Sequence, residues 1–173
     1  MEEKKKELYG RLDFVGWLLS EWRTRAVLPY VVGDLMDLAC GDNRLVRKNG
    51  SGVGVDIVDY QNVDIVCPDF SNLPFAENTF DTVTILAALN YFDNPVKVLS
   101  EIARILKPDG TLLVTFLNQS VSRAWHTIKE RDTTPRPAFN KEELAACLQT
   151  AGMHIVDRKS FMLGVNIIYF IKR

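Results

Sequence analysis

Apolar residues along this chain follow two patterns, short continuous runs and helical spacings. The runs are rich in β-branched residues and too short for helices, which predicts strands buried in a parallel sheet. Such strands are expected over residues 34–39, 52–56, 63–67, 80–86 and 111–117. Two more strands, around residues 154–160 and 165–172, flank Gly164 and are expected to form a hairpin.

Helical spacing predominates between these runs. A first helix is expected from Glu7 to Pro29, with its apolar residues on one face at alternating steps of four and three. Residues 43–48 leave room for a short helix at most, and a further helix is expected over 121–131. The apolar face of the first helix consists of Leu8, Leu12, Val15, Leu19, Trp22 and Ala26.

Capping and turn residues mark the later helices. Asn94 is expected to cap a helix with Pro95 in its first turn. Asn140 and Glu143 have the spacing of a capping box, which begins a helix that ends at Gly152. Residues 107–110, Lys-Pro-Asp-Gly, predict a tight turn into the strand over 111–117.

Strands that alternate with helices predict an α/β fold, a mostly parallel sheet with helices on both faces. The terminal hairpin is expected to add an antiparallel edge strand. The 173 residues form one expected domain, with an N-terminal helical cover over 1–30, a core over 34–117 and C-terminal helices and a hairpin over 118–173. The apolar fraction of 47% and the charged fraction of 25% are those of an ordinary globular protein.

Charge and cysteine content exclude several classes of protein. With 21 basic and 22 acidic residues, the net charge of −1 gives no strong signal for nucleic-acid binding, because there is no basic excess. No apolar run has the length of a membrane span. Cys40, Cys67 and Cys147 lack metal-like spacing, so no metal site is predicted, and without a signal peptide the chain is expected to be cytoplasmic.

Candidate chemistry is concentrated in the run from Asp34 to Arg44 and the piece Gly52–Asp56 that follows it. The order is strand, glycine turn, short helix, strand and carboxylate. A nucleoside-binding βαβ unit needs this order, because the turn lets a ligand approach the backbone and the acid can accept from both ribose hydroxyls. Asp56, at the end of the second strand, is therefore the sharpest single candidate.

A nicotinamide dinucleotide is the rival ligand for such a turn. Its fingerprint has three glycines, the last of which allows close helix packing. Here the matching positions hold Ala39 and Gly41, and no further glycine occurs before Gly50. A methionine side chain makes no such demand, so the pattern favours S-adenosylmethionine over a nicotinamide cofactor.

Five motifs in this order resemble those of class I S-adenosylmethionine-dependent methyltransferases. The resemblance extends from Asp34 to about Phe116 and implies a Rossmann-like sandwich on a seven-stranded, mostly parallel sheet. It also implies that residues 34–117 bind the cofactor and that 118–173 form the substrate side. The motifs are Asp37–Gly41, Val53–Asp56, Asp69–Phe75, Phe80–Val83 and Leu106–Gly110.

The resemblance also implies roles for single residues. Asp56, with Ile57 beside it, would bind the ribose, and Asp69 would accept from the adenine amino group while the Phe70 amide donates to the ring. Asp37 and Gly41 would surround the methionine moiety with Ala39, and Ala87 would line the donor pocket. The chain departs from the family where Ala39 and Asn43 replace glycines and where the first helix is short.

The implied reaction is direct displacement of a methyl group, with a small-molecule acceptor favoured. Candidates near the acceptor are Asn90, Tyr91, Asn118 and His126. A general base is needed only for an alcohol, phenol or protonated amine. The alternative function is a non-catalytic, methyltransferase-like binding or partner subunit, which the departures at Ala39 and Asn43 would favour. A nicotinamide-dependent enzyme is a third, weaker alternative.

Overall fold

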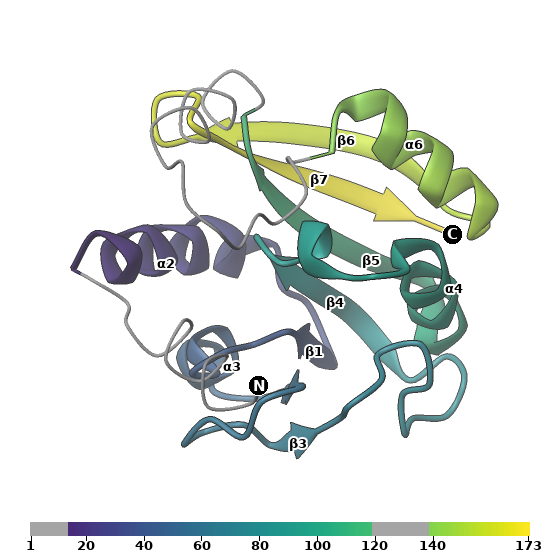
Figure 1. Cartoon of the computed structure of the whole chain (residues 1–173), viewed down its shortest axis with the longest axis horizontal. Coiled ribbons are helices and arrows are strands. Elements are labelled where there is room, and N and C mark those ends of the chain that lie inside the picture. Colours follow the sequence, from purple (N-terminus) through teal and green to yellow (C-terminus); the bar gives the residue numbers. More distant parts are fainter. Residues whose placement is uncertain (1–13, 119–138) are drawn as a thin grey trace.

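The computed structural model describes residues 14–118 and 139–173, so the helix expected over 121–131, with His126, lies outside the described residues. Its centre is a seven-stranded sheet in the order β3-β2-β1-β4-β5-β7-β6 (Figure 1). The predicted α/β class and Rossmann-like topology are confirmed. The strands are β1 (Leu35–Leu38), β2 (Val53–Asp56), β3 (Ile65–Val66), β4 (Phe80–Leu86), β5 (Leu106–Leu117), β6 (His154–Phe161) and β7 (Asn166–Lys172).

Strands β1 to β5 are parallel to one another, and strand order reverses between β1 and β4. Ligands of open α/β sheets bind outside the carboxyl ends of the strands at such a reversal. The hairpin is present, but the antiparallel strand β7 lies between β5 and β6. The predicted antiparallel hairpin is therefore confirmed, and β6, which pairs antiparallel with β7, is the edge strand because β7 is the more apolar strand and takes the buried position.

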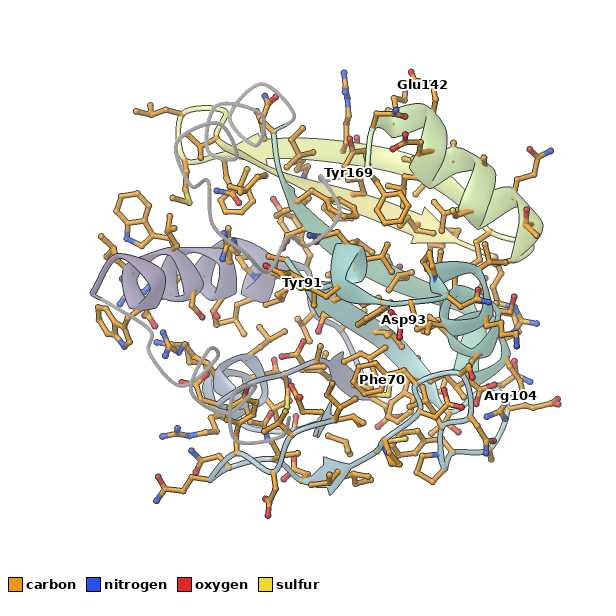
Figure 2. All side chains as sticks on the ribbon, viewed as in Figure 1. Phe70, Tyr91, Asp93, Arg104, Glu142 and Tyr169 are labelled. Atoms are coloured by element: carbon orange, nitrogen blue, oxygen red, sulfur yellow. The ribbon has the colours of Figure 1, made fainter. Side chains whose placement is uncertain are left out.

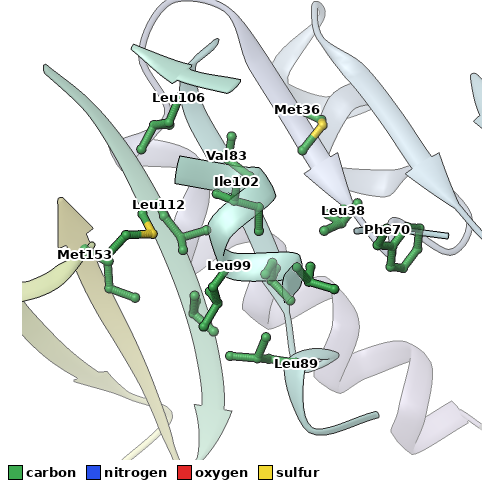
Figure 3. Close-up of a cluster of buried hydrophobic side chains, with 14 of the residues drawn as sticks. Met36, Leu38, Phe70, Val83, Leu89, Leu99, Ile102, Leu106, Leu112 and Met153 are labelled. Atoms are coloured by element: carbon green, nitrogen blue, oxygen red, sulfur yellow. The ribbon is translucent and has the colours of Figure 1, made fainter. Parts of the chain in front are cut away.

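The helices cover both faces of the sheet and enclose two apolar cores. On one face, α4 and α6 pack against the larger core, to which α4 contributes Val98, Leu99, Ile102 and Ile105 (Figure 3). On the other, α2 and α3 contribute Val27, Leu45 and Val46 to a smaller core. The helices are α2 (Phe14–Val27), α3 (Arg44–Asn49), α4 (Pro95–Ile105) and α6 (Lys141–Thr150), with 3-10 helices at Leu28–Tyr30 and Leu89–Tyr91.

The predicted caps are present where the helices begin. The Asn94 side chain accepts from the Lys97 amide, and Asn140 and Glu143 form the complete capping box. The first helix after β1 is short, as expected. None of the helices in residues 14–118 and 139–173 has the length and apolar character needed to cross a membrane.

Two local predictions are wrong. The Trp22 side chain is 46% exposed, and α2 instead buries Glu21, Thr24 and Val27. The carboxylate of Glu21 tolerates burial because Arg25 and Lys48 pair with it at 2.7 and 2.8 Å, so this side of α2 faces the basic residues of α3.

The second correction concerns residues 107–110, which belong to β5 rather than to a turn before it. Leu106 pairs with Phe80, and the next register pair joins Thr111 to Thr82, so the intervening residues bulge out of the ladder. The Lys107 ammonium holds the bulge to the sheet through Asp34 at 2.9 Å and Asp81 at 2.7 Å.

Candidate functional site

A cavity of about 720 Å³ opens at the strand-order reversal, beside the carboxyl ends of β1, β2 and β4. The chain segments around it come from α2, the β1–α3 turn, the β2 and β3 ends and the segment after β4. Its volume suits a small organic ligand. All of the residues that were predicted to bind the cofactor border it: Asp37, Ala39, Gly41, Asp56, Ile57, Asp69, Phe70 and Ala87.

The turn after β1 has alternating left-handed residues. Ala39, Gly41 and Asn43 each have φ of 57°. This conformation costs a residue with a Cβ atom about 1–2 kcal/mol, although asparagine visits it more readily. The chain thus keeps the backbone path of a glycine-rich turn at two positions that have lost their glycines.

Asn43 explains how the turn stays in place. Its side-chain amide donates to the carbonyl of Asn62 at 2.8 Å and to the Asp64 carboxylate at 2.7 Å. The same Asp64 oxygen accepts from the Gly54 amide of β2 at 2.7 Å. A Cβ on Gly54 would lie 2.1 Å from the Asn43 Oδ1, so Asn43 in the turn leaves no room for a side chain at position 54 of β2.

Asp56 is 6% exposed and lies at the end of β2, on the cavity wall. Its Oδ2 accepts from the Gly41 amide at 2.9 Å, and its Oδ1 accepts from the Val58 amide at 3.1 Å. These bonds fix the plane of the carboxylate, and each oxygen has a second lone pair for a further donor. The geometry suits acceptance from two neighbouring hydroxyl groups.

Asp37 lies deeper, 3% exposed, on β1. It accepts from the Thr84 hydroxyl at 2.5 Å. Burial, with a smaller contribution from the neighbouring carboxylates of Asp56 and Asp42, raises the pKa of Asp37 to about 7, although the hydrogen bond from Thr84 lowers it. Burial and the carboxylates of Asp37, Asp56 and Asp64 also raise the pKa of the Cys40 thiol, which therefore stays protonated. This side of the cavity is acidic.

Asp69 and Phe70 follow β3. The Asp69 side chain is exposed, and its Oδ1 accepts from both the amide and the hydroxyl of Ser71, at 2.9 and 2.7 Å. The Ser71 hydroxyl is the largest cause of the lowered pKa of Asp69. Phe70 is buried and packs edge-to-face on Phe92 with ring centroids 5.3 Å apart. Asp69 therefore has a turn-capping role whether or not it also binds a ligand.

Residues of α2 form a wall that the sequence did not reveal: Leu19, Ser20, Arg23 and Thr24 border the cavity. The Arg23 Nε donates to the Asn166 Oδ1 of β7 at 3.3 Å. Burial lowers the pKa of Arg23, whereas Tyr91 nearby raises it. In the sequence, helical spacing places Leu19 and Arg23 on the same face of a helix. That spacing does not show which residues the Arg23 side chain contacts.

The acceptor candidates are separated by the fold. Tyr91 borders the cavity and is the last residue of the 3-10 helix after β4 (Figure 2), and burial raises the pKa of its hydroxyl. Asn90 is its sequence neighbour but does not belong to the cavity wall. The side-chain amide of Asn118 donates to the carbonyl of Gly164 at 3.0 Å, and Asn118 also lies outside this wall.

A mostly parallel seven-stranded sheet with an inserted antiparallel β7 and a cavity at the β1–β4 reversal defines the class: a Rossmann-like methyltransferase fold. Residues 16–114 match the family model described as "Methyltransferase domain". The chain therefore belongs to the methyltransferase-domain family, as the motifs predicted, and the cofactor of this family is S-adenosylmethionine.

Relatives and solved structures agree with this assignment. The demethylmenaquinone methyltransferase of Corynebacterium kroppenstedtii is 44% identical over 154 residues, which cover 74% of this chain and 67% of the relative. A methyltransferase of Thermotoga maritima has a TM-score of 0.72 at 20% identity, over 99% of this chain and 94% of its own. These matches confirm the family and the fold.

A third similar protein is the 1,6-didemethyltoxoflavin-N1-methyltransferase of Burkholderia thailandensis. Its structure holds bound 1,6-didemethyltoxoflavin and S-adenosylhomocysteine. It has a TM-score of 0.70 at 18% identity, over 99% of this chain and 85% of its own, so the likeness is one of fold. The chain spans 55%, 67% and 57% of the length of three curated relatives, all named demethylmenaquinone methyltransferase.

Proposed function

We propose that this protein transfers a methyl group from S-adenosylmethionine to a small-molecule acceptor. The observation that carries the proposal is the convergence of all the predicted cofactor residues on one cavity, with the carboxylate of Asp56 held by two backbone amides at its wall. The names of the relatives, demethylmenaquinone methyltransferases, support a small-molecule acceptor.

The residues present fit an adenosyl group with an attached amino acid. Asp56 accepts from the two ribose hydroxyls, with Ile57 against the nucleoside. Asp69 and the amide of Phe70 recognise the adenine edge. Buried or partly buried small residues, Ala39 and Ala87 among them, leave room for the methionine chain.

Bound S-adenosylmethionine supplies a methyl group already activated on a sulfonium. The protein therefore acts mainly by orienting the donor and the acceptor in line and by excluding water. Asp37, when ionised, places negative charge at the end of the cavity where a positive sulfonium is favoured. Tyr91, at the wall after β4, is the proposed acceptor contact through packing or a hydrogen bond.

Isothermal calorimetry of the intact protein with S-adenosylmethionine and S-adenosylhomocysteine tests the proposal. We expect binding of both. Absence of binding at millimolar ligand would overturn the proposed cofactor and with it the enzyme.

A non-catalytic partner subunit is the second candidate. The left-handed Ala39 favours it, because its methyl group borders the cavity where the family has glycine, and so does the short α3. Copurification with a larger protein, combined with no cofactor binding, would support this second candidate over the first.

A further inference from the structure

Two guanidinium groups border the cavity, and they are placed differently. Arg44 pairs with the Asp42 carboxylate at 2.6 Å and also donates to the Trp17 carbonyl. Arg23 is partly buried and donates through Nε to the amide oxygen of Asn166 at 3.3 Å. Across residues 14–118 and 139–173, no carboxylate forms an ion pair with Arg23.

A partly buried cation without a paired carboxylate is costly. The guanidinium stays charged because its pKa lies far above neutrality, so it cannot escape the desolvation penalty by losing its proton. The ionisable group that acts on it is Tyr91, and burial raises the pKa of that hydroxyl, which keeps it neutral. The charge on Arg23 is therefore left for something that enters the cavity.

The position of Arg23 separates it from the two buried acids of the cavity, Asp37 and Asp56. Asn166, its partner, begins β7 and pairs with Leu117 at the end of β5. The carboxylates of Asp37 and Asp56 belong to β1 and β2, on the other side of β4. The charges that act on Asp37 are those of Asp56 and Asp42. The cavity thus has two buried acids at β1–β2, further acids at Asp69 and Asp93 on the segments after β3 and β4, and the guanidinium of Arg23 on the α2 wall.

We propose that Arg23 is an anion-binding residue that holds a carboxylate or a comparable acidic oxygen group of the ligand in this cavity. The guanidinium presents its terminal N–H groups as a planar fork, which matches two oxygens of one acid. The inference rests on the proposed function and adds that the part of the ligand near α2 carries an acidic group. The acid has two sources: the carboxylate of the cofactor's methionine, or an acidic group on the acceptor.

The first arm of the test measures the affinity for S-adenosylhomocysteine, which has the carboxylate, and for methylthioadenosine, which lacks it. The variants are Arg23→Gln and Arg23→Lys, and Arg25→Gln is the matched control on the same helix, since Arg25 is 71% exposed and pairs with Glu21. If the cofactor is the source, Arg23→Gln weakens S-adenosylhomocysteine roughly 10- to 100-fold and leaves methylthioadenosine unchanged.

The second arm uses protein saturated with S-adenosylhomocysteine and compares benzoate with neutral benzamide. If the acceptor is the source, the wild type prefers benzoate, Arg23→Gln loses that preference, and Arg23→Lys retains part of it. Thermal melting establishes that each variant is folded.

The inference is overturned if Arg23→Gln changes neither the affinity for S-adenosylhomocysteine nor the preference for benzoate. Failure of the proposed function looks different, since the wild-type protein itself would then bind neither S-adenosylhomocysteine nor methylthioadenosine. An equal loss in Arg25→Gln would also overturn the inference, because the effect would then be one of general charge.

Discussion

The two sides of the cavity are built by different means. On the β1–β2 side, Asp56 receives two backbone amides and Asn43 ties the turn to Asp64, all within one continuous stretch of chain. On the α2–β7 side, Arg23 meets Asn166 across 143 positions of sequence. Local hydrogen bonds position the first side, whereas packing of distant elements positions the second. A ligand that bridges the two sides would place a positively charged group near the acids of β1 and β2 and a negatively charged group near Arg23.

The largest effect is expected at Asp56, on the local side. Asp56→Asn should weaken S-adenosylhomocysteine by roughly 100-fold or more, because two charge-assisted hydrogen bonds to the ligand are lost or weakened. Calorimetry at fixed ionic strength measures this change. The control is Asp59→Asn, which alters net charge equally at an exposed neighbour. Equal affinity in Asp56→Asn and the wild type would remove Asp56 from the ligand site.

The two sides also differ in their response to pH, since Asp37 titrates near neutrality and Arg23 does not. The folded pKa of about 7 lies above the ordinary value of 3.8, so the folded protein binds a proton that the unfolded chain releases. This contribution to stability is complete below pH 3.8 and is lost as the pH rises to 7. We expect a loss of about 1 kcal/mol per pH unit across that window.

Urea denaturation between pH 4 and pH 8 measures the slope. Asp37→Asn should remove it, because the amide has no proton to lose in this range. If the variant and the wild type lose stability in parallel, groups other than Asp37 govern the pH dependence of stability. That result would contradict the expected contribution of the buried Asp37 carboxyl.

The packing of β2 against the turn after β1 is the third feature of the β1–β2 side that a substitution can test. Gly54→Ala should lower the free energy of unfolding by about 1–3 kcal/mol, because the added Cβ would lie 2.1 Å from the Asn43 Oδ1. Chemical denaturation measures the change. In the Asn43→Gly background the same substitution should cost less, and an unchanged cost there would show that the two residues are not coupled.

The smallest effect is expected at Ala39. Ala39→Gly should relieve the left-handed strain at φ of 57° and raise the free energy of unfolding by about 0.5 kcal/mol after the entropy cost of glycine. Ala88, which also borders the cavity but has φ of −120°, is the matched control and should gain nothing from glycine. A destabilised Ala39→Gly protein would contradict the strain argument.

Sequence reasoning succeeded where contacts are close along the chain. The caps at Asn94 and Asn140 depend on an amide three residues later, and the position of Asp56 depends on the short strand that precedes it. It failed at Trp22 and at residues 107–110. Burial of Glu21 depends on Lys48 of another helix, and the bulge depends on Asp34 and Asp81, so no local pattern could reveal either one.

The sequence alone determined the order of strands and helices, the family and the residues of the β1–β2 side, because apolar periodicity and short motifs encode local geometry. The tertiary structure alone placed β7 inside the sheet and brought Arg23 of α2 to the cavity beside Tyr91. The physical reason is that the helical spacing of a charged residue does not show its surroundings. Packing of distant elements decides which surface the charge faces and whether an opposite charge lies beside it.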